Sequence, residues 1–198
     1  MLYHETRIPG AYLIEPETYQ DERGFFTTVW VQRHFPRKQL DLPVKQCNVI
    51  YNREYGTLRG LHLQLPPHAE AKLIRCTRGA MYNVILDLRA GSPTFLQWHA
   101  VELSDENYTS LFIPTGLAHG FLTLYDETEV FYQTSEFYAP ESILGVRWND
   151  RRFNIHWPGE IRVISIKDKN IPDFDSASIT GIRFDETLNS DSIQVPPA

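Results

Sequence analysis

The sequence predicts an all-β protein, and three observations carry this prediction. Many short segments alternate apolar and polar residues or are rich in Val, Ile, Tyr and Phe. Turn-forming residues separate these segments, as in Arg78-Gly79 and Pro114-Thr115-Gly116. The composition includes 13 prolines, 11 glycines and 13% aromatic residues, whereas helix signals are few. The spacing of many short strands is typical of a β-sandwich or a barrel.

The elements follow in order along the chain. The first strands are predicted near residues 10–16 and 25–30, with the turn Asp21-Glu22-Arg23-Gly24 between them. A helix is predicted over Arg33–Leu40, but Pro36 limits it to a turn or two. Further strands are predicted near 43–51, 57–64, 71–78, 80–88, 97–103, 109–113, 118–124, 128–134 and 144–148. After Trp157-Pro158 the chain becomes more polar, so we divide it into a domain over 1–175 and a tail of unassigned role over 176–198.

Length and charge exclude several classes of protein. The 198 residues suit one domain with an appendage, and 42% apolar residues are enough for a core, which excludes general disorder. A net charge of −6 argues against wholesale nucleic-acid binding but allows a local basic pocket for a small anion. The longest apolar runs are too short to cross a bilayer, no signal peptide is visible, and two cysteines make no disulfide framework. We therefore expect a cytoplasmic protein with reduced thiols and no membrane or nucleic-acid partner.

A histidine with possible chemical use lies in the strand predicted over 57–64. Alternation places Leu58, Gly60, His62 and Gln64 on one face of that strand. Such a face of small and polar groups can line a ligand pocket inside a β-barrel. The alternative is a core histidine that bonds to a neighbour, and this segment alone leaves both interpretations open.

A second histidine lies in the segment Ile113–Phe121, where Pro-x-Gly-x-x-His resembles the second motif of the cupins, small barrels of the jelly-roll type. In cupins this His joins a His-x-His and a following Glu to hold a metal. Here the first segment reads His62-Leu63-Gln64, and the nearest acid, Glu70, lies beyond the usual spacing. Because at most two of the four ligands remain, we expect no metal and instead acid–base chemistry by His62 and His119.

Two further side chains, those of Lys72 and Tyr132, are suited to acid–base catalysis or to stabilising a negative charge. Lys72 aligns with the apolar Ile74 and Cys76, so it points into a pocket or snorkels at its rim. Inside a pocket it would stabilise an oxyanion, although a lone strand lysine is more often solvated. Tyr132 shares a face with Val130 and is a candidate general acid, although any one of ten tyrosines is by default a packing residue.

Taken in order, these segments resemble the dTDP-4-dehydrorhamnose 3,5-epimerase family. The match runs from about Arg23 to Asp168 and includes Gly56–Gln64, Lys72–Cys76, Asp87-Leu88-Arg89, Leu103–Asn107, Ile113–Phe121, Tyr138-Ala139-Pro140 and Trp148-Asn149-Asp150. The resemblance implies a metal-free cupin-type jelly-roll barrel with a few short helices and a C-terminal extension. It also implies a homodimer, a nucleotide-sugar substrate and no cofactor.

The resemblance further implies roles for individual residues. His62 matches the general base, and Asp168 matches the carboxylate that orients it. Tyr132 matches the general acid on the opposite face of the sugar, and Lys72 matches the group that stabilises the enolate oxygen. Phe26 is expected to reach the site from the other subunit. The positions that match substrate contacts are Arg23, Phe26, Gln46, Asn48, Arg59, His119, Tyr138 and Lys167.

The implied activity is that of an isomerase, which inverts C3 and C5 of a nucleotide-linked 4-keto-6-deoxyhexose for L-rhamnose-type sugars. The ketone at C4 acidifies both protons, a base removes one, and an acid on the other face returns one and inverts the centre. The alternatives are epimerisation at C3 alone and a CDP- or GDP-linked sugar. A non-catalytic sugar-nucleotide binding module is the alternative of a different class.

Several positions depart from the family pattern. Thr28 and Ile143 stand where the family usually has Glu, and Ala80 and Asn83 replace acids often found in its Gly-Glu-x-x-Asp segment. The run Val49-Ile50-Tyr51 is more apolar than usual. Because these positions line the expected nucleoside or sugar pocket, the chemistry is expected to be retained while the nucleotide or sugar differs. Thymidine remains the default nucleoside of the substrate.

Overall fold

The structure of the chain is a computed structural model that describes residues 1–35, 40, 42–179 and 184. It is built almost entirely of strands, which confirms the predicted fold class, and its two large sheets do not close into one continuous barrel. The first sheet follows the order β1-β2-β10-β7-β12-β5. Its strands are β1 (Leu2–Glu5), β2 (Tyr12–Glu15), β5 (Gln46–Asn52), β7 (Lys72–Arg78), β10 (Ser110–Ile113) and β12 (Thr128–Thr134).

The second sheet follows the order β13-β6-β11-β8-β9, and β14 pairs with β6 in parallel. Its strands are β6 (Thr57–Gln64), β8 (Ala80–Asp87), β9 (Trp98–Ser104), β11 (Leu117–Thr123), β13 (Ile143–Gly145) and β14 (Val163–Ile164). The helical segments are short, namely η1 (Gln32–His34), η3 (Pro140–Ser142), α1 (Ile166–Lys169) and η4 (Ser176–Ile179). None of the helices in the described part of the chain is long and apolar enough to cross a bilayer.

The two sheets face each other across the main hydrophobic core. Alternation along the strands sends Ile74 and Cys76 of β7 inward against Met81 and Ile85 of β8. The outer face of each sheet carries its own hydrophobic cluster. On the first sheet, Leu73 and Phe112 pack under Phe35, Leu40 and Leu42. On the second sheet, the buried residues are Leu61, Leu63, Val84, Leu86, Leu88, Ala118, Val146, Phe153, Phe174 and Ile179.

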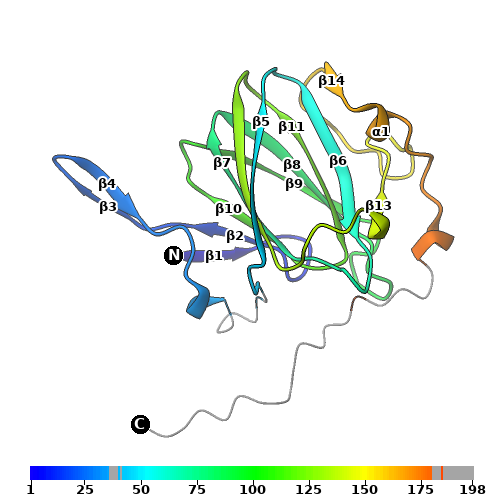
Figure 1. Ribbon diagram of the computed structural model, residues 1–198, viewed down its shortest axis with the longest axis horizontal. Helices are drawn as coiled ribbons and strands as arrows, with labels where there is room; N and C mark the ends of the chain where they lie inside the picture. Colours follow the sequence, from blue (N-terminus) through cyan, green and yellow to red (C-terminus); the bar gives the residue numbers. More distant parts are fainter. Residues whose placement is uncertain (36–39, 41, 180–183, 185–198) are drawn as a thin grey trace, which may run out of the picture.

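A hairpin of β3 (Thr18–Asp21) and β4 (Gly24–Thr27) projects away from both sheets (Figure 1). Its tip is the predicted turn Asp21-Glu22-Arg23-Gly24, and Gly24 adopts a φ of 121° that L side chains rarely adopt. The side chains of Tyr19 and Phe26 are 69% and 67% exposed. Exposed aromatic side chains on a projecting hairpin are typical of a surface that another molecule covers.

The differences from the predicted elements have local causes. The strand predicted over 25–30 ends at Thr27, and the strand predicted over 144–148 is β13, which ends at Gly145. Strands β1 and β3 were not predicted, because most or all of their residues are exposed and give no alternation. Of the helix predicted over 33–40, the structure has η1, and residues 36–39 lie outside the described residues.

The predicted tail over 176–198 begins against the body of the protein. Ile179 is buried in the cluster on the outer face of the second sheet, and Phe184 packs against the same cluster. Residues 180–183 and 185–198 lie outside the described residues.

Candidate active site

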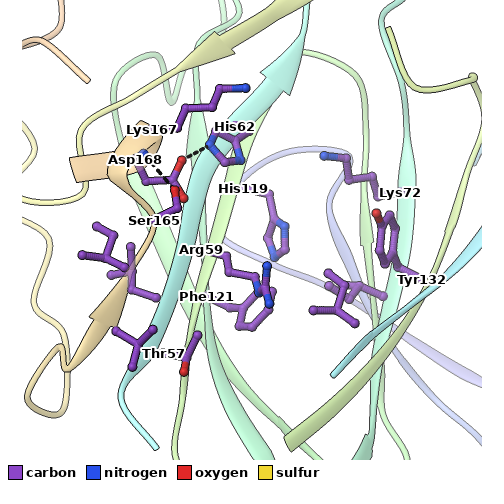
Figure 2. A pocket seen from close by; sticks show the side chains of 15 residues that line it. Thr57, Arg59, His62, Lys72, His119, Phe121, Tyr132, Ser165, Lys167 and Asp168 are labelled. Atoms are coloured by element: carbon purple, nitrogen blue, oxygen red, sulfur yellow. Dashed lines mark hydrogen bonds and ion pairs between the residues drawn. The ribbon is translucent and has the colours of Figure 1, made fainter. Parts of the chain in front are cut away.

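A cavity of about 490 Å³ lies between the two sheets, a size typical of small-molecule sites. Strands β5, β7 and β12 of the first sheet line it on one side, and β6 and β11 of the second sheet line it on the other. The turn from β14 into α1 completes the wall. The residues that sequence analysis proposed for the site and that line this cavity are Arg59, His62, Lys72, His119, Tyr132, Lys167 and Asp168 (Figure 2).

His62 and Asp168 form a hydrogen-bonded pair in the wall of the cavity. Nε2 of His62 lies 2.6 Å from Oδ1 of Asp168, and the backbone N–H of Gly60 donates to the other carboxylate oxygen at 3.4 Å. Burial by itself raises the pKa of the Asp168 carboxyl, but the hydrogen bonds from His62 and Gly60 outweigh it and lower that pKa below its usual value. The carboxylate is therefore charged at neutral pH, and it fixes the orientation of the imidazole.

A serine places this carboxylate. The one-turn helix α1 begins after Ser165, whose hydroxyl oxygen accepts a hydrogen bond from the N–H of Asp168 at 3.0 Å. This is the arrangement of a helix N-cap, which holds the first turn in a defined conformation. Asp168 is thereby only 4% exposed although α1 is very short.

An irregularity in β6 directs both Arg59 and His62 into the cavity. His62 pairs with His119 and Arg59 pairs with Phe121, so β6 uses one more residue than β11 over the same stretch. Such a bulge resets the alternation of side chains. The backbones also approach closely at Gly60, where an added Cβ would lie 2.6 Å from the carbonyl oxygen of His119. Simple alternation from Leu58 to Gln64 would have placed Arg59 on the opposite face from His62.

Arg59 is held in place by a buried amide. Its Nε donates to Oδ1 of Asn52 at 2.7 Å, and the Asn52 amide nitrogen donates to the carbonyl of Thr128 at 3.1 Å. The remaining guanidinium N–H groups are thus oriented at the cavity wall, where a planar fork of donors suits a phosphate group.

Lys72 and Tyr132 lie together on the other side of the cavity from His62 and Asp168 (Figure 2). Nζ of Lys72 lies 2.9 Å from a carboxylate oxygen of Glu70, and both side chains are largely buried. Burial first, and then the negative charge of Glu70, raise the pKa of Tyr132 above its usual value. The Tyr132 phenol is therefore protonated at physiological pH and is able to donate a proton.

His119 lies deep in the cavity between these two groups (Figure 2). Its Nε2 lies 3.1 Å from Oδ1 of Asn83, which is fully buried. Burial, followed by the positive charge of Lys72 and by His62 when its imidazole is protonated, lowers the pKa of His119 well below its usual value. The ring is therefore neutral at physiological pH.

Three other predicted residues form a polar group beside the cavity. The amide nitrogen of Gln46 donates to Oδ1 of Asn48 at 2.7 Å, and Oε1 of Gln46 accepts from the backbone N–H of Tyr138 at 3.4 Å. Asn48 is paired across the sheet with Tyr132, so this group adjoins the proposed general acid. The buried Nδ2 of Asn48 has no hydrogen-bond partner in the described part of the chain.

Arg23 and Phe26 are not brought to the cavity by the single chain. Both lie on the projecting hairpin, and the Arg23 guanidinium is exposed and paired with Asp21. A sequence match can relate such residues to a site, but the fold of one chain places them apart from it.

The residues missed by sequence analysis support those that it found. Ser165 was detectable, because Ser165-x-x-Asp168 has the spacing of a helix N-terminus. Glu70 lies beyond the spacing of a cupin metal ligand, and the structure makes it the partner of Lys72. Asn52 carried no local signal, since its partner Arg59 lies seven residues along the chain and across a turn.

Gln64 stands where a metal-binding cupin has a ligand, and its side chain is hydrogen-bonded to backbone groups. Its amide nitrogen donates to the carbonyls of His68 and Phe137, and its Oε1 accepts from the N–H of Ala139. Within the described residues, no three His, Cys, Asp or Glu side chains gather as metal ligands. The Gln64 side chain thus anchors the loop after β12.

Comparisons with known proteins agree with this geometry. The family model of dTDP-4-dehydrorhamnose 3,5-epimerase matches residues 5–176. A protein of that name from Sinorhizobium fredii is 40% identical, over 87% of this chain and 89% of its own length. One from Methanothermobacter thermautotrophicus is 43% identical, over 84% of this chain and 90% of its own length.

Solved structures show the same relation. The Bacillus anthracis dTDP-4-dehydrorhamnose 3,5-epimerase, with TDP and pyrophosphate bound, superimposes with a TM-score of 0.84 at 42% identity, covering 87% of this chain and 99% of that one. A 3′-monoepimerase from Streptomyces bikiniensis, in complex with dTDP-quinovose, has a TM-score of 0.81 at 35% identity and covers 89% of each chain. The chain therefore belongs to the dTDP-4-dehydrorhamnose 3,5-epimerase family.

Proposed function

We propose that the chain is an isomerase that epimerises a dTDP-linked 4-keto-6-deoxyhexose at C3 and C5. The observation that carries this proposal is the pair His62–Asp168 on one side of a cavity whose other side holds Tyr132 and Lys72. A base and an acid on opposite sides of a bound ring are what inversion of a carbon next to a ketone requires. The family and the dTDP ligands of related structures support the choice of substrate.

The base step is assigned to His62. Its Nε2–H donates to Asp168, which leaves the lone pair of Nδ1 to accept the proton from C3 or C5. The electron pair of the broken C–H bond moves into the enolate, whose negative oxygen at C4 is stabilised by the ammonium of Lys72. The Asp168 carboxylate stabilises the imidazolium that forms.

The acid step is assigned to Tyr132. Its phenol gives a proton to the carbon from the face opposite His62, and the enolate collapses to the ketone with that centre inverted. His62 then loses the abstracted proton and Tyr132 regains one from solvent, so the second carbon reacts in the same way. Each inversion leaves His62 with one extra proton and Tyr132 with one fewer, and exchange with solvent restores both, so the step needs no redox cofactor.

Binding of the nucleotide is assigned to the polar residues around the cavity. Arg59 and Lys167 place positive charge at the wall, where the diphosphate would lie. Gln46, Asn48 and the backbone of Tyr138 form the neighbouring polar group, which suits hydrogen bonding to a base. The exposed ring of Tyr138 is available for stacking on that base.

The site is completed by a second copy of the chain. Arg23 and Phe26 stand on the exposed hairpin β3–β4, which reaches away from the cavity of its own chain (Figure 1). In a homodimer, Phe26 of the partner subunit would close over the bound base. The exposed apolar Val49 and Tyr51 on the outer face of β5 add to the surface that a second copy would cover. Both cysteines are free thiols, which supports a cytoplasmic location.

Epimerisation at C3 alone is the second candidate. The similarity to a 3′-monoepimerase of Streptomyces bikiniensis, at 35% identity over 89% of each chain, favours it. Both candidates use the same four side chains, so they differ in whether the intermediate reacts again at C5.

Incubation with dTDP-4-keto-6-deoxyglucose in D2O, followed by NMR of the sugar, tests the proposal. Deuterium at C3 and C5 supports epimerisation at both carbons, and deuterium at C3 alone supports the second candidate. Absence of exchange at both carbons, together with calorimetric binding of CDP or GDP in preference to dTDP, contradicts the assigned nucleotide.

A further inference from the structure

Asn83 is a fully buried amide on the inner face of β8, where its neighbours on that face are Met81 and Ile85. A buried amide is costly unless its donors and acceptor find partners. Here Nδ2 donates to the carbonyl oxygen of Met81 at 3.3 Å, and Oδ1 faces Nε2 of His119 at 3.1 Å. These two contacts keep a polar group at a position whose surroundings are otherwise apolar.

The contacts also fix which hydrogen His119 carries. The carbonyl of Met81 can only accept, so the amide group of Asn83 must turn its nitrogen toward Met81 and its oxygen toward His119. An oxygen in that position accepts, so Nε2 of His119 must be the donor and hold a hydrogen. A neutral imidazole has one N–H, and Nδ1 is therefore left with a bare lone pair. In the described part of the chain Nδ1 makes no hydrogen bond, while His119 lines the cavity.

The surroundings keep this ring uncharged. Burial is the main cause of its lowered pKa, and the positive charge of Lys72 on β7 lowers that pKa further, as does His62 on β6 once its imidazole is protonated. The other titratable groups that line the same cavity are Arg59 on β6, Tyr132 on β12, and Lys167 and Asp168 in α1. The Asp168 carboxylate is engaged by His62 and Gly60. The partner on the buried side is an amide, which accepts a hydrogen bond but adds no negative charge to stabilise an imidazolium.

We propose that Asn83 is a positioning residue that holds His119 as the neutral Nε2–H imidazole, so that Nδ1 accepts a hydrogen bond from a hydroxyl of the bound sugar. The assignment of the sugar hydroxyl rests on the proposed function, whereas the tautomer of His119 does not. An aspartate at position 83, the acid that the family resemblance leads one to expect there, would stabilise the imidazolium instead. Nδ1–H would then donate, and a hydroxyl would have to accept. The residue at position 83 thus decides whether His119 accepts a hydrogen bond from the sugar hydroxyl or donates one to it.

The first test is NMR of the protein with 15N-labelled histidine. The His119 signals are identified by their absence in His119→Gln, and two-bond 15N–1H correlations distinguish the two tautomers. The expected result is the Nε2–H tautomer with no titration between about pH 5 and 8. An Nδ1–H tautomer, or titration near the ordinary histidine value, overturns the proposal.

The second test uses Asn83→Asp, which changes the amide into a carboxylate of the same shape. The midpoint of the His119 titration should rise by about 1–3 pH units, the range for an opposite charge in contact. An unchanged midpoint in the folded variant overturns the role of Asn83. If the variant does not fold, the wild-type tautomer still decides the proposal.

Ligand titrations separate this inference from the proposed function. The Nδ1 signal of wild-type His119 should move on addition of dTDP-glucose and stay in place on addition of dTDP. If the Nδ1 signal does not shift with either ligand while the enzyme exchanges sugar protons in D2O, the hydroxyl contact is wrong and the activity stands. If the tautomer is as expected and no exchange occurs, the activity is wrong and the role of Asn83 stands.

Discussion

Replacing Asp168 with asparagine removes one charge and preserves the shape of the side chain. In the wild type, the carboxylate accepts from two donors, Nε2–H of His62 at 2.6 Å and the N–H of Gly60 at 3.4 Å. An asparagine has one oxygen and one NH2 group, so it can accept from only one of these donors. If the NH2 group faces His62, the imidazole must carry its hydrogen on Nδ1 and can no longer take a proton from the sugar.

The size of the effect follows from two contributions. A hydrogen bond to a charged group is stronger than a neutral one by about 1–2 kcal/mol. The Asp168→Asn variant lacks this extra stabilisation at the moment when His62 becomes an imidazolium. The competing tautomer and the unpaired donor add about 1–2 kcal/mol. The sum of about 2–4 kcal/mol corresponds to a rate reduced roughly 30- to 1,000-fold.

The assay is the rate of deuterium incorporation at C3 in D2O, with the urea midpoint of each protein as a check on folding. Asp173→Asn is the matched control, because that carboxylate is exposed and pairs with Arg147 at the surface. The control should keep its rate, since surface ion pairs contribute little. Exchange by folded Asp168→Asn within about threefold of the wild-type rate would show that His62 does not depend on the charge of its carboxylate partner.

Three other parts of the structure give further predictions. Gly60→Ala should lower the free energy of unfolding, measured in urea, by about 2–4 kcal/mol, because the added Cβ would meet backbone atoms of His119 and Gly120. Gly91→Ala is the control: its Cβ would meet nothing within 4 Å, so it should lower that free energy by only about 1 kcal/mol, and equal losses in the two variants would contradict the prediction. A thiol reagent should label the exposed Cys47 in the native protein and reach Cys76 only on unfolding, because Cys76 is buried and burial raises its pKa to about 11. Rapid labelling of both cysteines in the native protein would contradict the burial of Cys76. Tyr132→Phe should reduce inversion more than exchange. Because burial and Glu70 raise the pKa of Tyr132, its phenol should stay protonated throughout the neutral and mildly alkaline range. An activity loss near about pH 8 that disappears in Tyr132→Phe would contradict that.

The fold was predictable where the side chains alternate. Strands β6 and β12 have the predicted bounds, because most residues of β6 and about half of those of β12 are buried and turns mark the ends of both strands. The hairpin strand β3 was not predictable, since Thr18–Asp21 is exposed on all sides in one chain and carries no pattern. Its aromatic residues become informative only beside the projecting shape of the hairpin.

The site was predictable through motifs rather than through geometry. His62, Lys72, His119, Tyr132 and Asp168 come from separate segments, and nothing in their spacing shows that they share a cavity. Glu70 was missed as a functional group, and Asn83 was recognised only as a departure from the family pattern, because their roles arise from contacts within the fold. Arg59 was given a role by resemblance, while the bulge in β6 that turns it toward His62 leaves no mark in the alternation.

The proposed mechanism depends above all on removal of the sugar proton by His62. It is tested most directly by comparing His62→Asn with the wild type in D2O while dTDP binding is followed by calorimetry. The variant should bind dTDP with an affinity close to that of the wild type and incorporate no deuterium at C3 or C5. Exchange at a near wild-type rate in the folded, dTDP-binding variant would show that another group is the base.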